Sequence, residues 1–580
     1  MIDGQQTEPA ERSEWHALVE GKMSRRRLLA GLAFAGGAAI VPLRLQTERA
    51  SAATAKRSAT FATLWPSSAD RLELPRGFEA DVLAPWGSPI GSGLTAGFNH
   101  DWTGFFPIDL LSFAPDLAAT HRGFLPKRAS SRDGLLVVNH EYVNSLFVSG
   151  YSGTGPKTAA QIAAEQAAVG ISVLRVRRGK GGHWSVDASE STYARRLDAM
   201  SPATLVGPAA SIDGGPGVVG TLANCSGGMT PWGTALSCEE NFQDYAAPGP
   251  EGYAWPADPY GKRHYGWVVE VDPFHPVSTP RKHTALGRFR HENVAIRVGD
   301  DGTVVAYMGD DKADSCVYKF VADRRLGAER DDNLRILEAG RLYVADFGNG
   351  AWLLVDYAAS SKIRDLENPD GTPTYASQID VLGDTRAAAI AVGGTPVDRP
   401  EDIEVNPRDG SVFVALTNNT GHGNFHGQIA RLVEDGDDPA ATTFSWSLFA
   451  VGGPQSGFSS PDNLLFDGDG DLWMVTDISS SRVGKGIYAF QGNNALFFLP
   501  TSGKDAGTAY QFASGPVDCE MTGPSWSPDG RTLFLSVQHP GELSTSASSP
   551  TSRWPSGSGV PQPATVAITG PWRKAAKSGR

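Results

Sequence analysis

The sequence predicts an all-β protein built as a β-propeller, and three observations lead to this prediction. Glycine and proline account for 67 and 39 of the 580 residues, which indicates many turns between short strands. Short runs of β-branched and aromatic residues lie between Gly, Pro and Asp over most of the chain. A unit of strand, Asp-Gly turn and strand recurs four times in the second half of the chain.

The composition excludes several classes of protein. Hydrophobic residues make up 40% and charged residues 20% of the chain, a balance typical of globular proteins rather than disordered ones. The net charge of −13 argues against nucleic acid or an anionic membrane as a partner. An anionic substrate could bind to such an acidic protein only if cations lay between the protein and the substrate. Only 4 cysteines are present, too few for a disulfide scaffold of this length.

The N-terminal region is predicted to be a twin-arginine signal peptide. A pair of arginines in the segment 24–29 precedes a Gly- and Ala-rich apolar run over 28–43, and small residues at 50–53 offer a cleavage site. The alternative, a membrane anchor, is disfavoured because the run is short and only moderately hydrophobic. We therefore expect a signal over residues 1–53 and one propeller domain over 54–580. Removal of seven basic and six acidic residues with the signal changes the net charge from −13 to −14.

One segment reads as a helix within the mature chain. Residues 158–169 are rich in alanine and end at Gly170, which is typical of a helix followed by its C-terminal glycine.

The four repeated units each begin with an acidic residue. The acid precedes the glycine of the Asp-Gly turn by ten, nine, eight and ten residues in the four units. These acids are Glu292, Glu401, Asp462 and Glu520. In a propeller the first strand of each blade lines the central channel, so these acids would converge on the axis. Unpaired carboxylates there would repel one another, and bound cations resolve that repulsion. The alternative is that the acids cap turns and face water.

Two earlier segments could supply the remaining blades. Residues 135–142 read as a strand that ends in polar residues, among them Glu141. Residues 224–241 combine a glycine-rich approach with a strand that ends in Glu239 and Glu240. Because neighbouring strand residues face opposite sides, only one of these two glutamates should point inward unless a bulge intervenes.

Cys225 is a candidate thiolate ligand. A soft ligand among hard carboxylates would favour a transition metal such as iron, whereas all-oxygen positions would suit calcium. Two alternatives remain open at this point: a disulfide with Cys238, or a small buried apolar side chain.

Arg399 stands two residues before Glu401, so both side chains share one face of an extended chain. A guanidinium beside a metal-bound carboxylate would present a bidentate site for an anion such as phosphate. A simple ion pair between Arg399 and Glu401 fits the spacing equally well.

Other candidates carry weaker signals. Residues 467–471 resemble the start of an EF-hand loop, but they lack its sixth-position glycine and its twelfth-position glutamate and are interpreted as an acidic hairpin turn. His140, His291 and His539 lie beside candidate ligands or strand ends, where they could support a ligand or serve a structural hydrogen bond.

At these residues the chain resembles the PhoX-type bacterial alkaline phosphatases. The export signal is similar, and so are the segments 139–141, 224–241, 287–292, 309–311, 399–402, 461–464 and 538–542. The resemblance implies a secreted six-bladed propeller with inserted loops and a few short helices. It also implies a calcium–iron cluster (Ca²⁺ and Fe³⁺), with Cys225 as an iron ligand. The other implied ligands are Glu141, Glu239 or Glu240, Glu292, Glu401, Asp462 and Glu520, and Arg399 would orient the phosphate.

The expected function is metal-assisted hydrolysis of small phosphate monoesters in the periplasm or outside the cell. The metals would polarise the phosphoryl oxygens and supply the nucleophile, so no serine or threonine nucleophile is needed. The expected partners are the phosphate ester and the twin-arginine export machinery, with no nucleic acid and no stable membrane anchor, and the chain is expected to be a monomer. Two alternatives are another calcium-dependent propeller hydrolase, lactonase-like or phytase-like, and a non-enzymatic propeller that binds a ligand.

Overall fold

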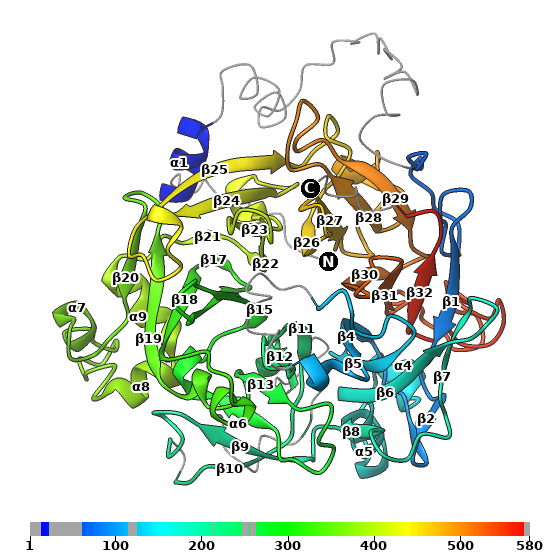
Figure 1. Ribbon diagram of the computed structural model, residues 1–580, viewed down its shortest axis with the longest axis horizontal. Coiled ribbons are helices and arrows are strands. Elements are labelled where there is room, and N and C mark those ends of the chain that lie inside the picture. The colour runs from blue at the N-terminus through cyan, green and yellow to red at the C-terminus, as the bar shows by residue number, and fades with distance from the viewer. Residues whose placement is uncertain are drawn as a thin grey trace.

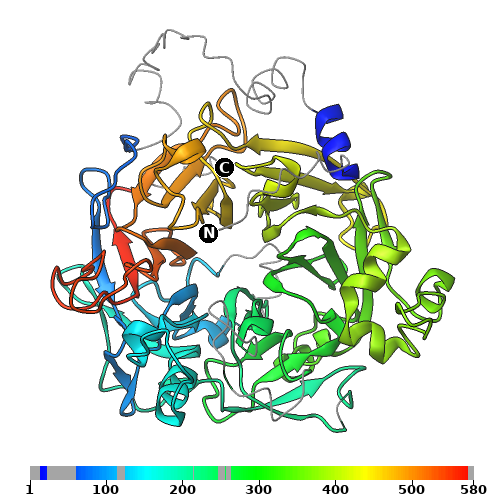
Figure 2. The same cartoon turned by 180° about the vertical axis from the view of Figure 1, so that it is seen from behind.

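Six β-sheets surround a central axis in the computed structural model (Figure 1), and the same ring is seen from behind in Figure 2. The structure describes residues 13–22, 61–113, 125–212, 214–245, 255 and 263–572. The six-bladed propeller predicted from the sequence is confirmed.

The first three blades are formed by the chain up to residue 354. Blade one contains β4 (His100–Pro107), β5 (Asp133–His140), β6 (Gly170–Arg178), β7 (Trp184–Val186) and β8 (Arg195–Leu197). Blade two contains β9 (Pro202–Val206), β10 (Gly217–Val219), β11 (Asn224–Met229), β12 (Ala235–Glu239), β13 (Val268–Val271) and β14 (Arg281–His283). Blade three contains β15 (His291–Val298), β16 (Thr303–Asp310), β18 (Val317–Arg325), β19 (Gly340–Asp346) and β20 (Ala351–Leu354).

The last three blades are more regular. Blade four contains β22 (Pro400–Val405), β23 (Val412–Leu416), β24 (Gln428–Glu434) and β25 (Phe444–Val451). Blade five contains β26 (Pro461–Phe466), β27 (Leu472–Thr476), β28 (Ala495–Leu499) and β29 (Tyr510–Ser514). Blade six contains β30 (Glu520–Trp526), β31 (Thr532–Gln538), β32 (Ala564–Thr569) and β1 (Glu79–Leu83).

Blade six closes the ring because its outermost strand comes from the other end of the chain. Strand β1 pairs antiparallel with β32, with Val82 opposite Val566. Beside the blades there are two small ribbons, formed by β2 (Pro89–Gly91) with β3 (Leu94–Thr95) and by β17 (Ala313–Ser315) with β21 (Val397–Asp398).

Helices are short and lie outside the sheets. The predicted helix at 158–169 is confirmed as α5 (Ala159–Ala168), and Thr158 forms a capping box with Gln161 at its start. The other α-helices are α1 (Glu14–Lys22), α4 (Ser145–Val148), α6 (Arg330–Asn333), α7 (Ser361–Arg364), α8 (Gln378–Gly383) and α9 (Thr385–Val392). The 3-10 helices are η2 (Leu110–Phe113), η3 (Phe242–Tyr245), η4 (Thr284–Leu286), η5 (Ile336–Glu338), η6 (Thr420–His422), η7 (Asp435–Asp437) and η8 (Gly486–Tyr488).

The predicted signal peptide is described only over α1, and residues 23–53, with the arginine pair and the apolar run, lie outside the described residues. Within the part of the chain that the structure describes, no helix has the length and apolar character needed to cross a membrane.

The six innermost strands β4, β11, β15, β22, β26 and β30 contact one another in sequence around the axis. Each of them has a register shift against the second strand of its blade. A bulge breaks the strict alternation of side chains, so two consecutive residues can both serve the interior. Because of the bulge, a strand can direct one polar residue to the axis and the next residue to the neighbouring blade.

A second backbone feature recurs just before these strands. Five residues with positive φ stand two positions before Asp101, Cys225, Glu401, Asp462 and Glu520. They are Asn99, Ala223, Arg399, Ser460 and Asp518, with φ between 33° and 55°. Non-glycine residues adopt this conformation at an energetic cost, and such residues concentrate at functional sites.

Polar side chains on the inner strands fasten each blade to the next. The amide of Asn293 donates to the carbonyl of Ile403 (2.7 Å) and accepts from its N–H (3.0 Å). Asp402 accepts from the N–H of Leu464 at 3.0 Å, and Asn463 accepts from the N–H of Gly523 at 2.7 Å. The backbone N–H and C=O groups that the bulges leave without a strand partner therefore form hydrogen bonds with side chains of the preceding blade.

Replacing Asn293 by alanine should destabilise the propeller. The side chain is 1% exposed, and its loss leaves the buried N–H and C=O of Ile403 without these partners, at about 1–3 kcal/mol for each unsatisfied group. Urea unfolding should show a lower midpoint for Asn293→Ala. The exposed turn residue Asn368 provides the control, and an Asn293→Ala midpoint equal to that of Asn368→Ala would refute the role of this contact.

Candidate metal centre

Six carboxylates and one thiol gather around the axis at one end of the inner strands. They form three overlapping groups in which the ligand atoms lie within 4.8 Å of one another: Asp101, Glu141 and Cys225; Cys225, Glu240 and Glu292; Glu292, Glu401 and Asp462. Cys225 belongs to the first and second groups, and Glu292 to the second and third. The shared residues join the groups into one continuous cluster, called here the axial cluster.

The members of the axial cluster occupy two kinds of position in the blades. One lies near the start of the inner strand and holds Asp101, Cys225, Glu292, Glu401 and Asp462 in blades one to five. The other is the first residue after the second strand of the blade and holds Glu141 in blade one and Glu240 in blade two. The same second position holds Asp311 and Asp477 in blades three and five, at the edge of the cluster.

The axial cluster is almost completely buried, with no member more than 9% exposed. Burial, reinforced by neighbouring carboxylates, raises the pKa of Glu141 to about 8. Burial raises the pKa of Asp101 to about 6 although its hydrogen bonds oppose the change. The pKa values of Glu240 and Glu292 also lie well above the usual range, because of burial first and neighbouring acids second. Negative charge at this position is therefore costly unless cations accompany it.

Cys225 lies at the junction of the first two groups. Its Sγ is 3.1 Å and 3.3 Å from the two carboxylate oxygens of Glu292 and 3.4 Å from Oδ2 of Asp101. All four cysteines are free, so the alternative of a disulfide with Cys238 is wrong. Burial and the surrounding carboxylates raise the pKa of the Cys225 thiol, so formation of a thiolate at this position requires a nearby cation.

The glycines beside Cys225 have a packing role. A Cβ at Gly227 would overlap the carbonyl oxygen of Leu236, and a Cβ at Gly228 would overlap that of Val294 on blade three. The glycine-rich approach therefore permits close contact between backbones.

Of the two neighbouring glutamates offered as alternative ligands, Glu240 lies in the axial cluster and Glu239 does not. The carboxylate of Glu239 accepts from Nζ of Lys282 at 2.6 Å, in a pair with both side chains 0% exposed. It also accepts from the N–H groups of Gly266 and Trp267. As the last residue of β12 it faces the interior of blade two, whereas Glu240 faces the axis, in agreement with the expectation that only one of them points inward.

Glu520 lies at the margin of the axial cluster and in none of its three groups. It adjoins Asp462, and Nε2 of His539 is 3.4 Å from its Oε2. The strand register of blade six explains why Glu520 lies at the margin rather than within a group. Glu520 pairs regularly with Gln538, and the shift occurs later, between Thr522 and Ser525.

Asp101 was not identified from the sequence. Its blade does contain an Asp-Gly pair, Asp133-Gly134, but the 25 residues 108–132 separate β4 from β5, so the spacing of eight to ten residues between acid and turn is lost. Gln538 was noted only as a strand end. Its amide donates to Asp101 and to Glu141, each at 2.8 Å, and holds these two carboxylates together.

Arg399 contacts the third group of the axial cluster. Its Nε and Nη2 donate to the two oxygens of Asp311 at 2.8 Å and 2.6 Å, and Nη2 lies 2.7 Å from Oε1 of Glu401. The expected ion pair with Glu401 is therefore present. Although burial lowers the pKa of Arg399, the charges of Asp311 and Glu401 raise it well above its usual value. The side chain is 30% exposed, so it connects the buried cluster with solvent.

The three candidate histidines divide into two classes. His140 contacts the Phe98 carbonyl and Ser172, and His291 contacts the Gly287 carbonyl, so both serve structural hydrogen bonds. His539 alone lies beside a candidate ligand, Glu520. The acidic segment 467–471 joins β26 to β27 as the predicted hairpin turn.

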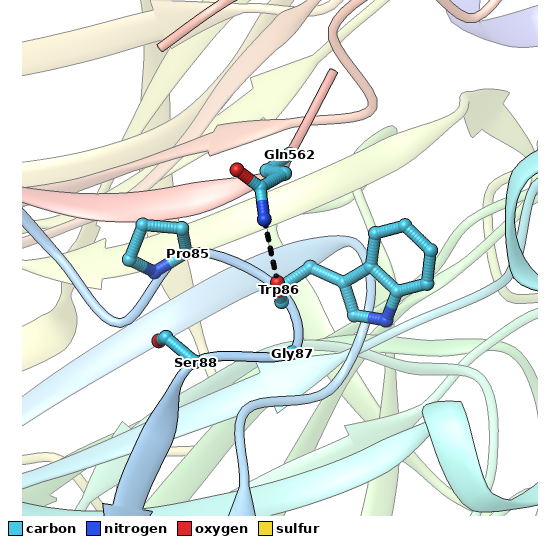
Figure 3. Close-up of a pocket in the computed structure, with 5 residues that line it drawn as sticks. All are labelled: Pro85, Trp86, Gly87, Ser88 and Gln562. Atoms are coloured by element: carbon cyan, nitrogen blue, oxygen red, sulfur yellow. Dashed lines mark hydrogen bonds between the residues drawn. The ribbon is translucent and has the colours of Figure 1, made fainter. Parts of the chain in front are cut away.

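A surface pocket of about 420 Å³ lies apart from these residues. It is lined by Pro85, Trp86, Gly87, Ser88 and Gln562, and the amide of Gln562 donates to the Trp86 carbonyl at 3.0 Å (Figure 3). It contains no member of the axial cluster and no ionisable side chain, so it contributes nothing to metal binding.

Comparison with known proteins places the chain in a family. Residues 59–541 match the family described as alkaline phosphatase PhoX. The structure of Pseudomonas fluorescens PhoX in complex with vanadate, a transition state analogue, is similar with 32% identity and a TM-score of 0.74, covering 88% of this chain and 98% of that one. A protein of unknown function from Dyadobacter fermentans is similar with 13% identity and a TM-score of 0.34, covering 86% of this chain and 100% of that one. A search among curated proteins gives no match.

The family match and the matching solved structure each span most of the chain. The chain belongs to the PhoX family of alkaline phosphatases, enzymes that hydrolyse phosphate monoesters.

Proposed function

We propose that the axial cluster holds calcium and iron ions and is the place where phosphate monoesters are hydrolysed. The observation that carries the proposal is the overlap of three buried acidic groups through Cys225 and Glu292. Separate sites would each need their own ligands, whereas shared ligands hold several cations a few ångströms apart.

The donor set supports this choice of metals. Carboxylate oxygens from Asp101, Glu141, Glu240, Glu292, Glu401 and Asp462 suit the hard calcium ion. The single soft donor, Cys225, suits iron, and its neighbours Glu292 and Asp101 lie close enough to share that ion. Glu520 is proposed as a peripheral ligand beside Asp462, and Glu239 is not proposed as a ligand.

The chain's own residues would bind and orient the substrate. When bound, the cations polarise phosphoryl oxygens, activate water and neutralise the charge of the transition state. Asp311 fixes the guanidinium of Arg399 through two parallel hydrogen bonds. Among the described residues, Nη1 of Arg399 makes none of these contacts, and its two N–H groups are available to a phosphoryl oxygen arriving from solvent. The vanadate complex of the Pseudomonas fluorescens protein supports a phosphoryl-transfer site in this family.

The substrates proposed are small phosphate esters, the class of substrate hydrolysed by the family, which the partly exposed Arg399 can contact beside the cluster. We further propose that residues 1–53 direct export by the twin-arginine pathway, so that the monomeric enzyme acts in the periplasm or outside the cell. This pathway carries folded proteins, which fits an enzyme that loads metal during folding.

The neighbouring residues Glu240 and Glu239 give a matched pair of variants. Glu240→Gln should lower both the metal content and the activity, because it removes a carboxylate from the axial cluster. Glu239→Gln should retain the metal but lower the free energy of unfolding by about 3–5 kcal/mol, since it leaves Lys282 buried without a charged partner. Elemental analysis and urea unfolding measure the two effects. If Glu239→Gln lost metal and Glu240→Gln retained it, Glu239 rather than Glu240 would be the ligand.

Replacement of Cys225 tests the iron ligand. Cys225→Ala should lose iron and any charge-transfer colour, because no other thiol lies in the cluster of described residues. Cys316→Ala is the control, since Cys316 is also a buried free thiol but belongs to the apolar core of blade three. Unchanged iron content in Cys225→Ala would eliminate the thiolate assignment.

Replacement of Arg399 tests the phosphate-binding role. Arg399→Ala should reduce kcat/KM for an aryl phosphate by about 10²-fold or more while the metal content stays unchanged, because a donor to the transition state is lost. Arg408→Ala is the control on the same blade, where Arg408 is 61% exposed. Activity of Arg399→Ala within a few-fold of the unmodified enzyme would leave only the ion pair as its role.

A further inference from the structure

Helix α1 precedes the arginine pair in the sequence and lies against the rim of blades three and four, beside β25 (Figure 1). Trp15 on this helix is 0% exposed. Its ring stacks on Trp446 of β25 and meets Phe347 edge-on, both with centroids 5.1 Å apart. A fully buried tryptophan is the kind of anchor that dominates the energy of an interface.

Polar contacts fix the orientation of the helix. Nε1 of Trp15 donates to Oδ2 of Asp398 at 3.0 Å, so the only polar atom of the indole is satisfied. Nζ of Lys22 donates to the Trp446 carbonyl at 3.2 Å and lies 5.0 Å above the Trp446 ring. The first and last turns of the helix are therefore both attached to the propeller.

One face of the helix makes these contacts. Trp15, Leu18, Val19 and Lys22 follow the spacing of a single helical face, and Leu18 and Val19 pack against the same apolar core as Trp15. Ala17 and Gly21, on the other side, are exposed. This face therefore carries the contacts of the helix with a groove lined by Phe347, Asp398 and Trp446.

The groove exists only in the folded protein. Phe347 follows β19 of blade three, Asp398 lies on β21, and Trp446 lies on β25 of blade four, so about 100 residues of chain must fold to bring them together. Nε1 of Trp446 donates to the Phe347 carbonyl at 2.9 Å and joins the two blades beneath the helix.

We propose that residues 14–22 are a docking element by which the folded propeller holds its own export signal. Lys22 precedes the pair Arg25-Arg26 by three residues, so docking of α1 attaches the arginine pair to an enzyme whose third and fourth blades have folded. Removal of residues 1–53 would take α1 with it and leave the aromatic groove on the mature chain. The link to export rests on the signal proposed above, whereas the docking rests on the contacts alone.

Amide hydrogen exchange of the full-length chain tests the docking. Residues 14–22 should exchange at least about tenfold more slowly than in Trp15→Ala, since loss of even 1.4 kcal/mol of contact energy opens the helix tenfold more often. Trp15→Phe keeps an aromatic ring at this position but loses the Nε1–H donor to Asp398. This variant should give an exchange rate between those of the unmodified chain and Trp15→Ala. Trp65→Ala is the control, because Trp65 is 87% exposed. Phosphatase activity should stay within about twofold in all three variants, which shows that the propeller is intact. Equal exchange in the unmodified chain and in Trp15→Ala would overturn the proposal.

Two further measurements separate docking from export. As urea increases, protection of residues 14–22 should disappear no later than that of β25. Protection that persists after β25 exchanges freely would place the docking elsewhere. The double variant Arg25→Lys, Arg26→Lys should abolish export. Export that continues would refute the assignment of the signal, while the exchange result would still decide whether the helix docks.

Discussion

The mutual repulsion of buried carboxylates on the propeller axis is the constraint on which the rest of this structure depends. Six acids and a thiol form three overlapping groups, in each of which the ligand atoms lie within 4.8 Å of one another, with almost no access to water. In that setting burial raises the pKa values of Glu292 and Asp462, and neighbouring acids raise them further. The cations proposed for this cluster would reverse the local charge. A chain with a net charge of −13 could then attract an anionic ester to its most acidic region.

The fold contributes a rigid frame that forces these groups together. Register shifts in the inner strands turn adjacent residues to different tasks, as at Glu292, which faces the axis, and Asn293, which fastens blade three to blade four. Backbone conformations of positive φ two residues earlier recur in five blades and set the direction of each strand start. The energetic cost of these features is offset by inter-blade hydrogen bonds and by closure of the ring through β1 and β32.

Much of this arrangement could be predicted from the sequence because it is repetitive. The similar spacing of acid and Asp-Gly turn, eight to ten residues, revealed blades three to six and three members of the axial cluster, Glu292, Glu401 and Asp462. Asp101 was missed because a long connection between β4 and β5 separates the acid from its turn. The choice between Glu239 and Glu240 stayed open because the partner of Glu239, Lys282, is 43 residues away, and local spacing cannot reveal a buried ion pair formed across a sheet. Glu520 has the right spacing but a different strand register, which places it at the margin.

The proposal that calcium and iron in the axial cluster enable the hydrolysis can be tested by elemental analysis of the purified enzyme paired with an aryl phosphate assay. We predict that both metals are present, that a chelator removes metal and activity together, and that adding calcium and iron restores both. Full activity in protein free of calcium and iron would contradict it.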